Sequence, residues 1–187
     1  NLIGTDRTGT RAIPNDVAID VRGSGNRIGT NVDGVSDTFE RNVISGNIVT
    51  GIVIIGDAAT GTVVQGNFVG VDSSGTQSLG NGFYGIVLTN THGNRIGGSQ
   101  SSPVPVYEGD MAYYEGDFVQ LPVPPTAGNV ISGNAVDGIH LDYSHDNVIQ
   151  GNHIGADYLG LQAVGNGRFG IWLIESARNQ IGGGEED

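Results

Sequence analysis

The sequence predicts an all-β protein, a right-handed parallel β-helix (β-solenoid) of about five coils with one inserted arm. Three observations lead to this prediction. A short phrase beginning with asparagine recurs along the chain, a second phrase of the form Gly-Ile-x-Leu is interleaved with it, and turn-forming residues fill the gaps, with 33 glycines among 187 residues. Internal repeats of this kind indicate stacked coils rather than a globular core.

The second phrase supplies the strands. It starts at residues 18, 51, 85, 138 and 170, so its steps are 33, 34, 53 and 32 residues, and the long step marks an insertion between Gly98 and Gly128. Apolar residues two apart, such as Ile52 and Ile54, indicate short strands. No stretch of helical period is long enough to cross back over a sheet. We therefore expect coils of short strands and turns that stack at roughly 4.8 Å.

The first phrase is expected to mark a corner of each coil. Its nine copies begin at Asn1, Asn26, Asn42, Asn67, Asn94, Asn129, Asn147, Asn152 and Asn179. Stacked asparagine side chains can bond to one another in a ladder, as amides do in stacked strands. This structural role is favoured over nine separate active sites.

The loops alternate along the chain. Tight bends at 64–67 and 149–152 are each followed by a long loop, at 72–84 and 157–169, whereas the other coils are longer after Asn26-Arg-Ile-Gly and Asn94-Arg-Ile-Gly-Gly. The repeating unit is therefore a pair of coils. Asn81-Gly82 and Asn166-Gly167 are predicted to be loop tips, and as Asn-Gly pairs they are expected to deamidate.

Composition limits the class of partner and the compartment. The chain has no cysteine and no lysine, and its 8 arginines face 20 acidic residues, for a net charge of -12. Disulfides and thiolate metal sites are excluded, nucleic acid and anionic membranes are disfavoured, and Ca²⁺ or a neutral or cationic partner is compatible with this charge. No apolar run is long enough to span a membrane. Residues 1–187 are expected to form a single domain that is part of a longer extracellular array.

Several motifs carry a resemblance to a known superfamily. They are Asn42-Val-Ile-Ser-Gly-Asn47, Val64-Gln-Gly-Asn67-Phe-Val-Gly-Val-Asp72, Asn94-Arg-Ile-Gly-Gly98, Asn129-Val-Ile-Ser-Gly-Asn134 and Asn147-Val-Ile-Gln-Gly-Asn-His-Ile-Gly-Ala-Asp157. They resemble the right-handed parallel β-helix repeats of the pectate-lyase-like superfamily, and most closely the Asn/Gly-rich arrays of large secreted or surface-anchored bacterial proteins. The resemblance covers nearly all of the chain except residues 99–127. It implies an extracellular or cell-surface location and makes carbohydrate the first ligand to test.

The strands predict which side chains face outward. In Gly-Ile-x-Leu, the Ile and Leu face the core, so x and the residue after Leu face solvent. The first outward column is Asp20, Val53, Val87, His140 and Trp172; the second is Arg22, Ile55, Thr89, Asp142 and Ile174. Val53, Ile55, Val87, Trp172 and Ile174 would form an exposed apolar stripe, which another chain, a neighbouring domain or the arm would cover.

The candidate site lies on this face, where 138–146 is the densest polar segment. The candidate catalytic residues are His140, Asp142 and Asp20, and the candidate ligand-binding residues are Trp172, His140, Asp142, Tyr143, His145, Tyr113 and Tyr114. The alternative is a solvated strand edge with local hydrogen bonds. Since the pair Asp20/Arg22 lies about 10–15 Å from His140/Asp142 by stacking distance, the arrangement is poor for catalysis by paired carboxylates.

The insertion at 99–127 departs from the repeat and holds five of the 6 prolines. Glu108-Gly-Asp110 and Glu115-Gly-Asp117 are expected on two strands of a hairpin. A covering or partner-binding arm is the favoured interpretation, and a sugar-binding lid is the alternative.

Asp6, Asp72 and Asp157 each precede a glycine by three residues. This pattern is typical of a turn in which the carboxylate accepts backbone N–H bonds. A Ca²⁺ site is the alternative, but one Asp per loop supplies few of the six to eight oxygens that Ca²⁺ prefers. We expect no other cofactor.

The sequence thus favours a non-catalytic extracellular scaffold or adhesive module that engages a glycan or a protein. One alternative is a carbohydrate-active enzyme, a polysaccharide lyase, hydrolase or epimerase that acts on the strand face. Another is a self-assembling fibre or oligomer subunit that associates through the stripe or through open coil ends.

Overall fold

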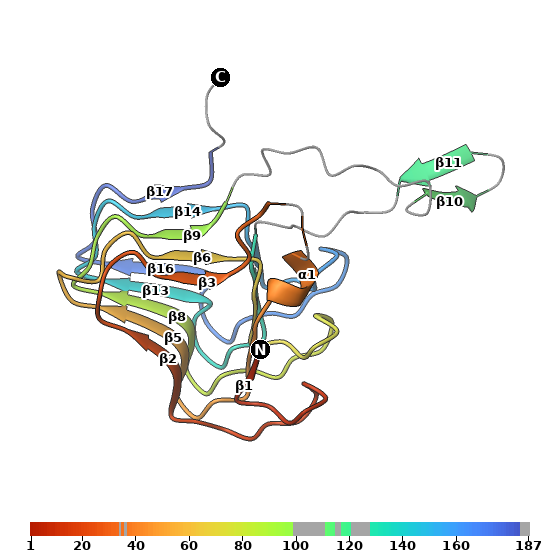
Figure 1. Cartoon of the computed structure of the whole chain (residues 1–187), viewed down its shortest axis with the longest axis horizontal. Coiled ribbons are helices and arrows are strands. Elements are labelled where there is room, and N and C mark those ends of the chain that lie inside the picture. The colour runs from red at the N-terminus through yellow and green to blue at the C-terminus, as the bar shows by residue number, and fades with distance from the viewer. Residues whose placement is uncertain (34, 36, 99–110, 115–116, 121–127, 184–187) are drawn as a thin grey trace.

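The computed structural model describes residues 1–33, 35, 37–98, 111–114, 117–120 and 128–183. It confirms a right-handed parallel β-helix of five coils (Figure 1). Each coil contributes one strand to each of three parallel five-stranded sheets. No helix in these ranges is both long and apolar enough to cross a membrane, and the helix α1 (Asp37–Glu40) is a single turn.

The strands are short and stack in sequence order. Sheet 1 contains β1 (Leu2–Ile3), β4 (Val43–Ile44), β7 (Phe68–Val69), β12 (Val130–Ile131) and β15 (His153–Ile154). Sheet 2 contains β2 (Val17–Val21), β5 (Thr50–Ile55), β8 (Tyr84–Thr89), β13 (Ile139–Asp142) and β16 (Ile171–Ile174). Sheet 3 contains β3 (Arg27–Gly29), β6 (Val63–Gln65), β9 (Arg95–Gly97), β14 (Val148–Gln150) and β17 (Gln180–Ile181).

The core runs along the axis of the solenoid. The inward positions of the three sheets are filled mainly by β-branched and leucine side chains that pack into one cluster, and Ile44, Ile54, Leu88 and Leu141 are fully buried. These side chains alternate with outward residues along each strand, as the apolar spacing predicted. Burial of this continuous apolar column is what holds the coils in register.

The predicted asparagine ladder exists, and it forms at two corners. Before sheet 1, each side-chain amide donates to the side-chain oxygen in the next coil, over 2.7 to 3.1 Å, in the series Asn1, Asn42, Asn67, Asn129 and Asn152. Before sheet 3, the same bonds join Asn94, Asn147 and Asn179. Asn26 is the exception among the nine, because its amide bonds to the carbonyl of Gly23 and Thr62 occupies the next place in the column.

A third ladder, before sheet 2, was not predicted. It joins Asn15, Asn47, Asn81, Asn134 and Asn166 over 2.8 to 3.1 Å. The prediction that Asn81 and Asn166 are loop tips was therefore wrong. Asn81 is fully buried, since the long loop that precedes it ends at this corner.

The long loops explain the two-coil period. Those of coils one, three and five run outward and return, which is marked by antiparallel bridges between Thr5 and Ala12, Val71 and Ser78, and Ala156 and Ala163. Each of these loops has an outgoing and a returning segment that lie side by side, so the loop is two strand spacings high along the axis of the solenoid. Loops of this height can stack on one another only if they occur in every second coil. They do stack, through bonds from the N–H of Ser73 to the carbonyl of Gly9 (3.0 Å) and from the N–H of Tyr158 to that of Gly75 (3.0 Å).

The stacked loops enclose a second apolar cluster outside sheet 1, which contains Val43, Phe68, Val71, Val130 and Val164. The outer face of sheet 1 is therefore covered by the chain itself. No second apolar cluster covers the outer face of sheet 2 among the described residues.

The three loop aspartates are turn residues, as the turn interpretation predicted. One carboxylate oxygen of each accepts bonds from N–H groups two to five residues on, such as those of Thr10 for Asp6, Gln77 for Asp72 and Gln162 for Asp157. Within the described ranges, no group of three or more His, Asp or Glu side chains is arranged to hold a metal ion.

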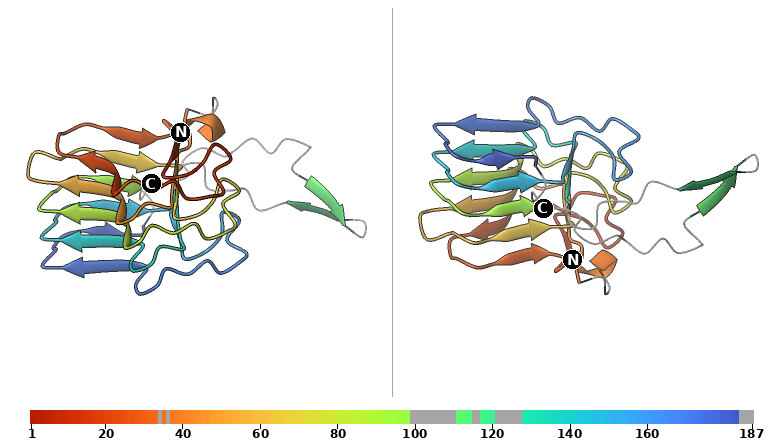
Figure 2. Two further views of the ribbon diagram at one scale, coloured as in Figure 1. Left: turned by 90° about the horizontal axis from the view of Figure 1, so that it is seen from below. Right: turned by 90° about the horizontal axis from the view of Figure 1, so that it is seen from above.

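The described part of the arm contains an antiparallel hairpin. β10 (Met111–Tyr114) pairs antiparallel with β11 (Asp117–Gln120). Glu108-Gly-Asp110 and Glu115-Gly116 lie outside the described residues, and Asp117 begins β11. Tyr113 and Tyr114 are on β10. All views in Figures 1 and 2 place the hairpin beyond the side of the solenoid opposite to sheet 2.

Candidate functional site

The outer face of sheet 2 carries the predicted columns. Asp20, Val53, Val87, His140 and Trp172 pair in register from coil one to coil five. Ile55, Thr89, Asp142 and Ile174 form the second column. Arg22 lies one residue beyond the end of β2, and its side chain folds back to bond Asp20.

The apolar stripe is less open than expected. Val53, Ile55, Val87, Trp172 and Ile174 are each half-buried, because neighbouring side chains in the columns cover part of them. His140 and Asp142 also separate the residues of coils two and three from those of coil five. The hydrophobic surface is concentrated instead at the start of the sheet 2 strands.

His140 is the centre of this region. It is 8% exposed, and its Nδ1 lies 3.1 Å from a carboxylate oxygen of Asp137, which is fully buried. The other carboxylate oxygen of Asp137 accepts the N–H of Phe169 (3.2 Å). Nδ1 of His140 is directed at the carboxylate, and Nε2 makes no hydrogen bond within the described residues.

Gly138 makes this pair possible. Strict strand alternation would place Asp137 and His140 on opposite faces of the sheet, because they are three residues apart. The backbone bends at Gly138, where an added Cβ would lie 2.6 Å from the carbonyl oxygen of Gly170 in the next coil. Only glycine allows the coils to approach this closely, and the bend brings Asp137 to the histidine.

Aromatic rings surround the pair. The ring of Tyr84 lies 4.7 Å from that of His140, and Trp172 meets His140 edge-on at 4.8 Å. Phe169 lies 5.4 Å from Trp172. These four rings come from three successive coils, so the stacking of coils assembles them on one surface.

Arg168 completes the cluster. Its guanidinium lies 4.2 Å from the centre of the Trp172 ring and 4.6 Å from that of Phe169, a cation–π geometry with both. No side-chain hydrogen bond or ion pair of Arg168 is present within the described residues. Its N–H groups therefore remain available to an external acceptor.

The two predicted carboxylates do not meet. Asp20 forms an exposed ion pair with Arg22, with a shortest distance of 3.0 Å. Asp142 is three coils away in the neighbouring column, so the two carboxyl groups are separated by three strand rows, roughly 14 Å. A pair of carboxylates at catalytic distance does not form from these residues.

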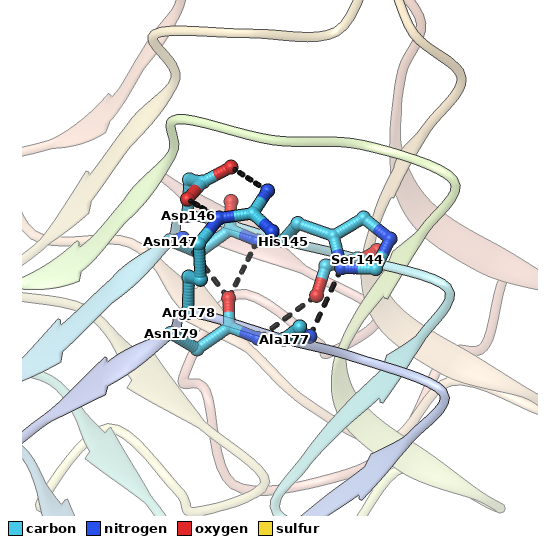
Figure 3. A network of polar contacts seen from close by, with 7 residues as sticks. All are labelled: Ser144, His145, Asp146, Asn147, Ala177, Arg178 and Asn179. Carbon is cyan, nitrogen blue, oxygen red and sulfur yellow. Dashed lines mark hydrogen bonds and ion pairs between the residues drawn. The ribbon is translucent and has the colours of Figure 1, made fainter.

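His145 lies at the corner after β13 and belongs to a different network (Figure 3). His145 Nδ1 accepts the N–H of Ala177 (2.9 Å), and Asp146 forms a two-bond ion pair with Arg178, with both bonds at 2.7 Å. The Arg178 hydrogen bonds lower the pKa of Asp146 below its ordinary value. This network joins the last two coils, and Tyr143 is exposed beside it.

The structure thus brings His140 and Trp172 together and leaves Asp20, Asp142 and His145 outside the cluster. Sequence reasoning missed Asp137, Arg168, Phe169 and Tyr84. The signal that could have found them is the pair of residues before the glycine of the second phrase, which reads Phe83-Tyr84 in coil three and Arg168-Phe169 in coil five. Tyr113 and Tyr114, on the hairpin, remain predicted ligand contacts.

Comparisons with protein-family models, with curated proteins and with solved structures each found no match to this chain. The class of the protein, a parallel β-helix, therefore rests on its sheets and their register.

Proposed function

We propose that this chain is a non-catalytic scaffold or adhesive module of a secreted or surface-anchored bacterial protein, and that it engages its partner through the aromatic–histidine cluster on sheet 2. The observation that carries the proposal is the cluster of Tyr84, His140, Phe169 and Trp172 with Arg168 on the uncovered face. Partly exposed aromatic rings beside an arginine are typical of recognition surfaces. The resemblance to pectate-lyase-like β-helix repeats supports an extracellular setting and a glycan among the ligands to test.

Rigid stacking supports the scaffold role. Three asparagine ladders and a continuous core fix the positions of the surface residues. A surface held by the fold loses little conformational entropy on binding, which favours affinity without any change of shape.

The test is binding of the purified chain to a panel of neutral and acidic polysaccharides and to a displayed peptide library. We expect binding to one class and its loss in Trp172→Ala. Phe39→Ala is the matched control, because Phe39 is an exposed aromatic residue on α1 that lies outside the cluster. The absence of binding to every probe, or equal loss in the two variants, would refute the proposal.

A carbohydrate-active enzyme is the second candidate, and one observation favours it. The Asp137–His140 contact resembles the arrangement in which a carboxylate orients a histidine that acts as general base through its other nitrogen. Size analysis of polysaccharides after incubation, with and without Ca²⁺, decides between the two candidates. Shortened chains that disappear in both His140→Ala and Asp137→Asn would establish the enzyme.

Self-association is the third candidate. Core residues line a hollow of about 330 Å³ beside Ile3, Ile19 and Ile28 in coil one, and one of about 230 Å³ beside Ile154 and Ile171 in coil five. However, coils one and five both carry the long loop, and each such loop needs two rows. Direct stacking of coil five on coil one of a second copy would therefore crowd the loops, and we expect sedimentation to show a monomer.

A further inference from the structure

The surface next to His140 extends along one edge of the solenoid. We call it the aromatic edge and define it as Ile48, Val49, Phe83, Phe169, Trp172 and Arg168. Ile48 is 56% exposed, Phe83 49% and Phe169 40%, which is high for large apolar side chains. Backbone bonds from Phe83 to Val49, from Val136 to Phe83 and from Arg168 to Val136 join four coils into one continuous row.

The composition of the aromatic edge is that of a protein interface. Trp, Phe and Arg are enriched where proteins bind one another, and aliphatic residues such as Ile48 and Val49 extend the apolar area. The row spans three steps between coils, roughly 14 Å, and neither of the hollows described above includes it. An apolar row suits a peptide segment better than it suits a sugar chain, whose hydroxyl groups need polar partners.

Charge complementarity defines the occupant more closely. The net charge of -12 favours a partner that is neutral or cationic as a whole. At the aromatic edge itself, however, Arg168 has no acidic partner within the described residues, so a single acidic side chain can pair with it locally. Two other arginines, Arg22 and Arg178, are paired with acids. The remaining arginines also lack an acidic partner within the described residues, but Arg168 is the arginine whose guanidinium stacks on two aromatic rings. Stacking on two rings fixes the guanidinium plane while leaving its N–H fork free, and this fork matches a carboxylate.

We propose that the aromatic edge binds a polypeptide segment of a partner protein in which an acidic side chain, flanked by apolar residues, pairs with Arg168. This inference deepens the proposed function and rests on it. Trp172 and Phe169 hold the guanidinium, and Phe83, Val49 and Ile48 bind the apolar flank.

The test is selection of a displayed random peptide library against the whole chain, followed by affinity measurement with synthetic peptides by fluorescence anisotropy. We expect selected peptides to share an Asp or Glu between apolar residues. Replacing that acid with its amide, or Arg168 with Gln, should each weaken binding about tenfold. Because each change removes the same contact, the two together should weaken it no further.

Two controls separate this contact from general charge and from the fold. Arg7→Gln removes the same charge from an exposed arginine elsewhere and should leave affinity unchanged. Arg168→Lys keeps the charge but loses the planar fork, so it should restore only part of the affinity.

Selected peptides without acidic residues, or peptides that bind Arg168→Gln as tightly as the original chain, would overturn the inference. Binding of polysaccharides with no peptide selected would also overturn it while the proposed function stands. Failure of peptides and polysaccharides alike would refute both.

Discussion

Removal of the Asn81 side chain tests whether the asparagine ladders hold the coils together. Asn81 is fully buried at the corner before sheet 2. Its side-chain oxygen accepts the backbone N–H (3.2 Å) and the amide (2.8 Å) of Asn47, and its own amide donates to the carbonyl of Ile44 (3.2 Å) and to Asn134 (2.9 Å). Asn81→Ala therefore removes four buried hydrogen bonds and leaves the N–H of Asn47 without its acceptor.

The magnitude follows from these bonds. Each contributes about 1 kcal/mol net, so we expect Asn81→Ala to lower the free energy of unfolding by about 3–5 kcal/mol. Asn81→Asp keeps the shape and both accepted bonds, but it directs an oxygen at the oxygens of Ile44 and Asn134. We expect this isosteric change to cost at least as much as the alanine, because a buried charge then faces two acceptors. The same reasoning predicts that the folded chain resists deamidation at Asn81.

The assay is urea unfolding followed by circular dichroism, with the transition midpoint compared at unchanged slope. Asn26→Ala is the control, since Asn26 begins the same phrase but is exposed and bonds to the carbonyl of Gly23. We expect the control to change stability by under about 1 kcal/mol. A loss under about 1 kcal/mol in Asn81→Ala, or a loss equal to that of the control, would refute the structural role of the ladder.

Three further predictions concern packing and charge. Gly85→Ala should lower the free energy of unfolding by about 1–3 kcal/mol, because the new Cβ would lie 2.6 Å from a carbonyl oxygen of the next coil. Gly165→Ala is the control and should be neutral in the same urea unfolding assay, because a Cβ at Gly165 would have no neighbouring atom within 4 Å. Thr62→Val should raise stability by about 1 kcal/mol, measured by urea unfolding, because the buried Thr62 hydroxyl has no hydrogen-bond partner in the described structure. A decrease would show that the hydroxyl is satisfied. The hydrogen bonds from Arg178 lower the pKa of Asp146 in the folded chain. The ion pair therefore stabilises the fold at pH values above the pKa of Asp146 in the unfolded chain, about 4. This stabilisation is lost as the pH falls through the lower pKa that Asp146 has in the folded chain. Melting temperatures from neutral pH to about pH 2 should therefore fall less steeply in Asp146→Asn, and parallel curves would contradict this assignment.

The local pattern of the sequence determined the coils. Ile52 and Ile54 alternate with outward residues, and turn formers separate each strand from the next, so the strand period and the five coils could be predicted without knowledge of contacts. The outward column from Asp20 to Trp172 followed from the same alternation. Asparagine at a repeated position also predicted a ladder at one corner of the coils, and the structure divides those asparagines between two corners.

Prediction failed where local pattern and tertiary contact disagree. Asn81-Gly82 has the composition of a loop tip, but the preceding loop returns to the corner and buries Asn81 in a ladder. Strict alternation would separate Asp137 from His140, but the backbone bends at Gly138 and the two side chains meet.

The sequence by itself determined the repeat, the strand faces and the acidic character of this protein, because these depend on residue type and spacing along one strand or one turn. Only the tertiary structure decided that long loops pair every second coil and that Arg168 lies on Trp172 and Phe169 beside His140. Those contacts join residues from different coils or around a bend. The contacts between coils depend on how closely one coil packs on the next, and that distance is set by glycines and by cross-coil hydrogen bonds that no single repeat contains.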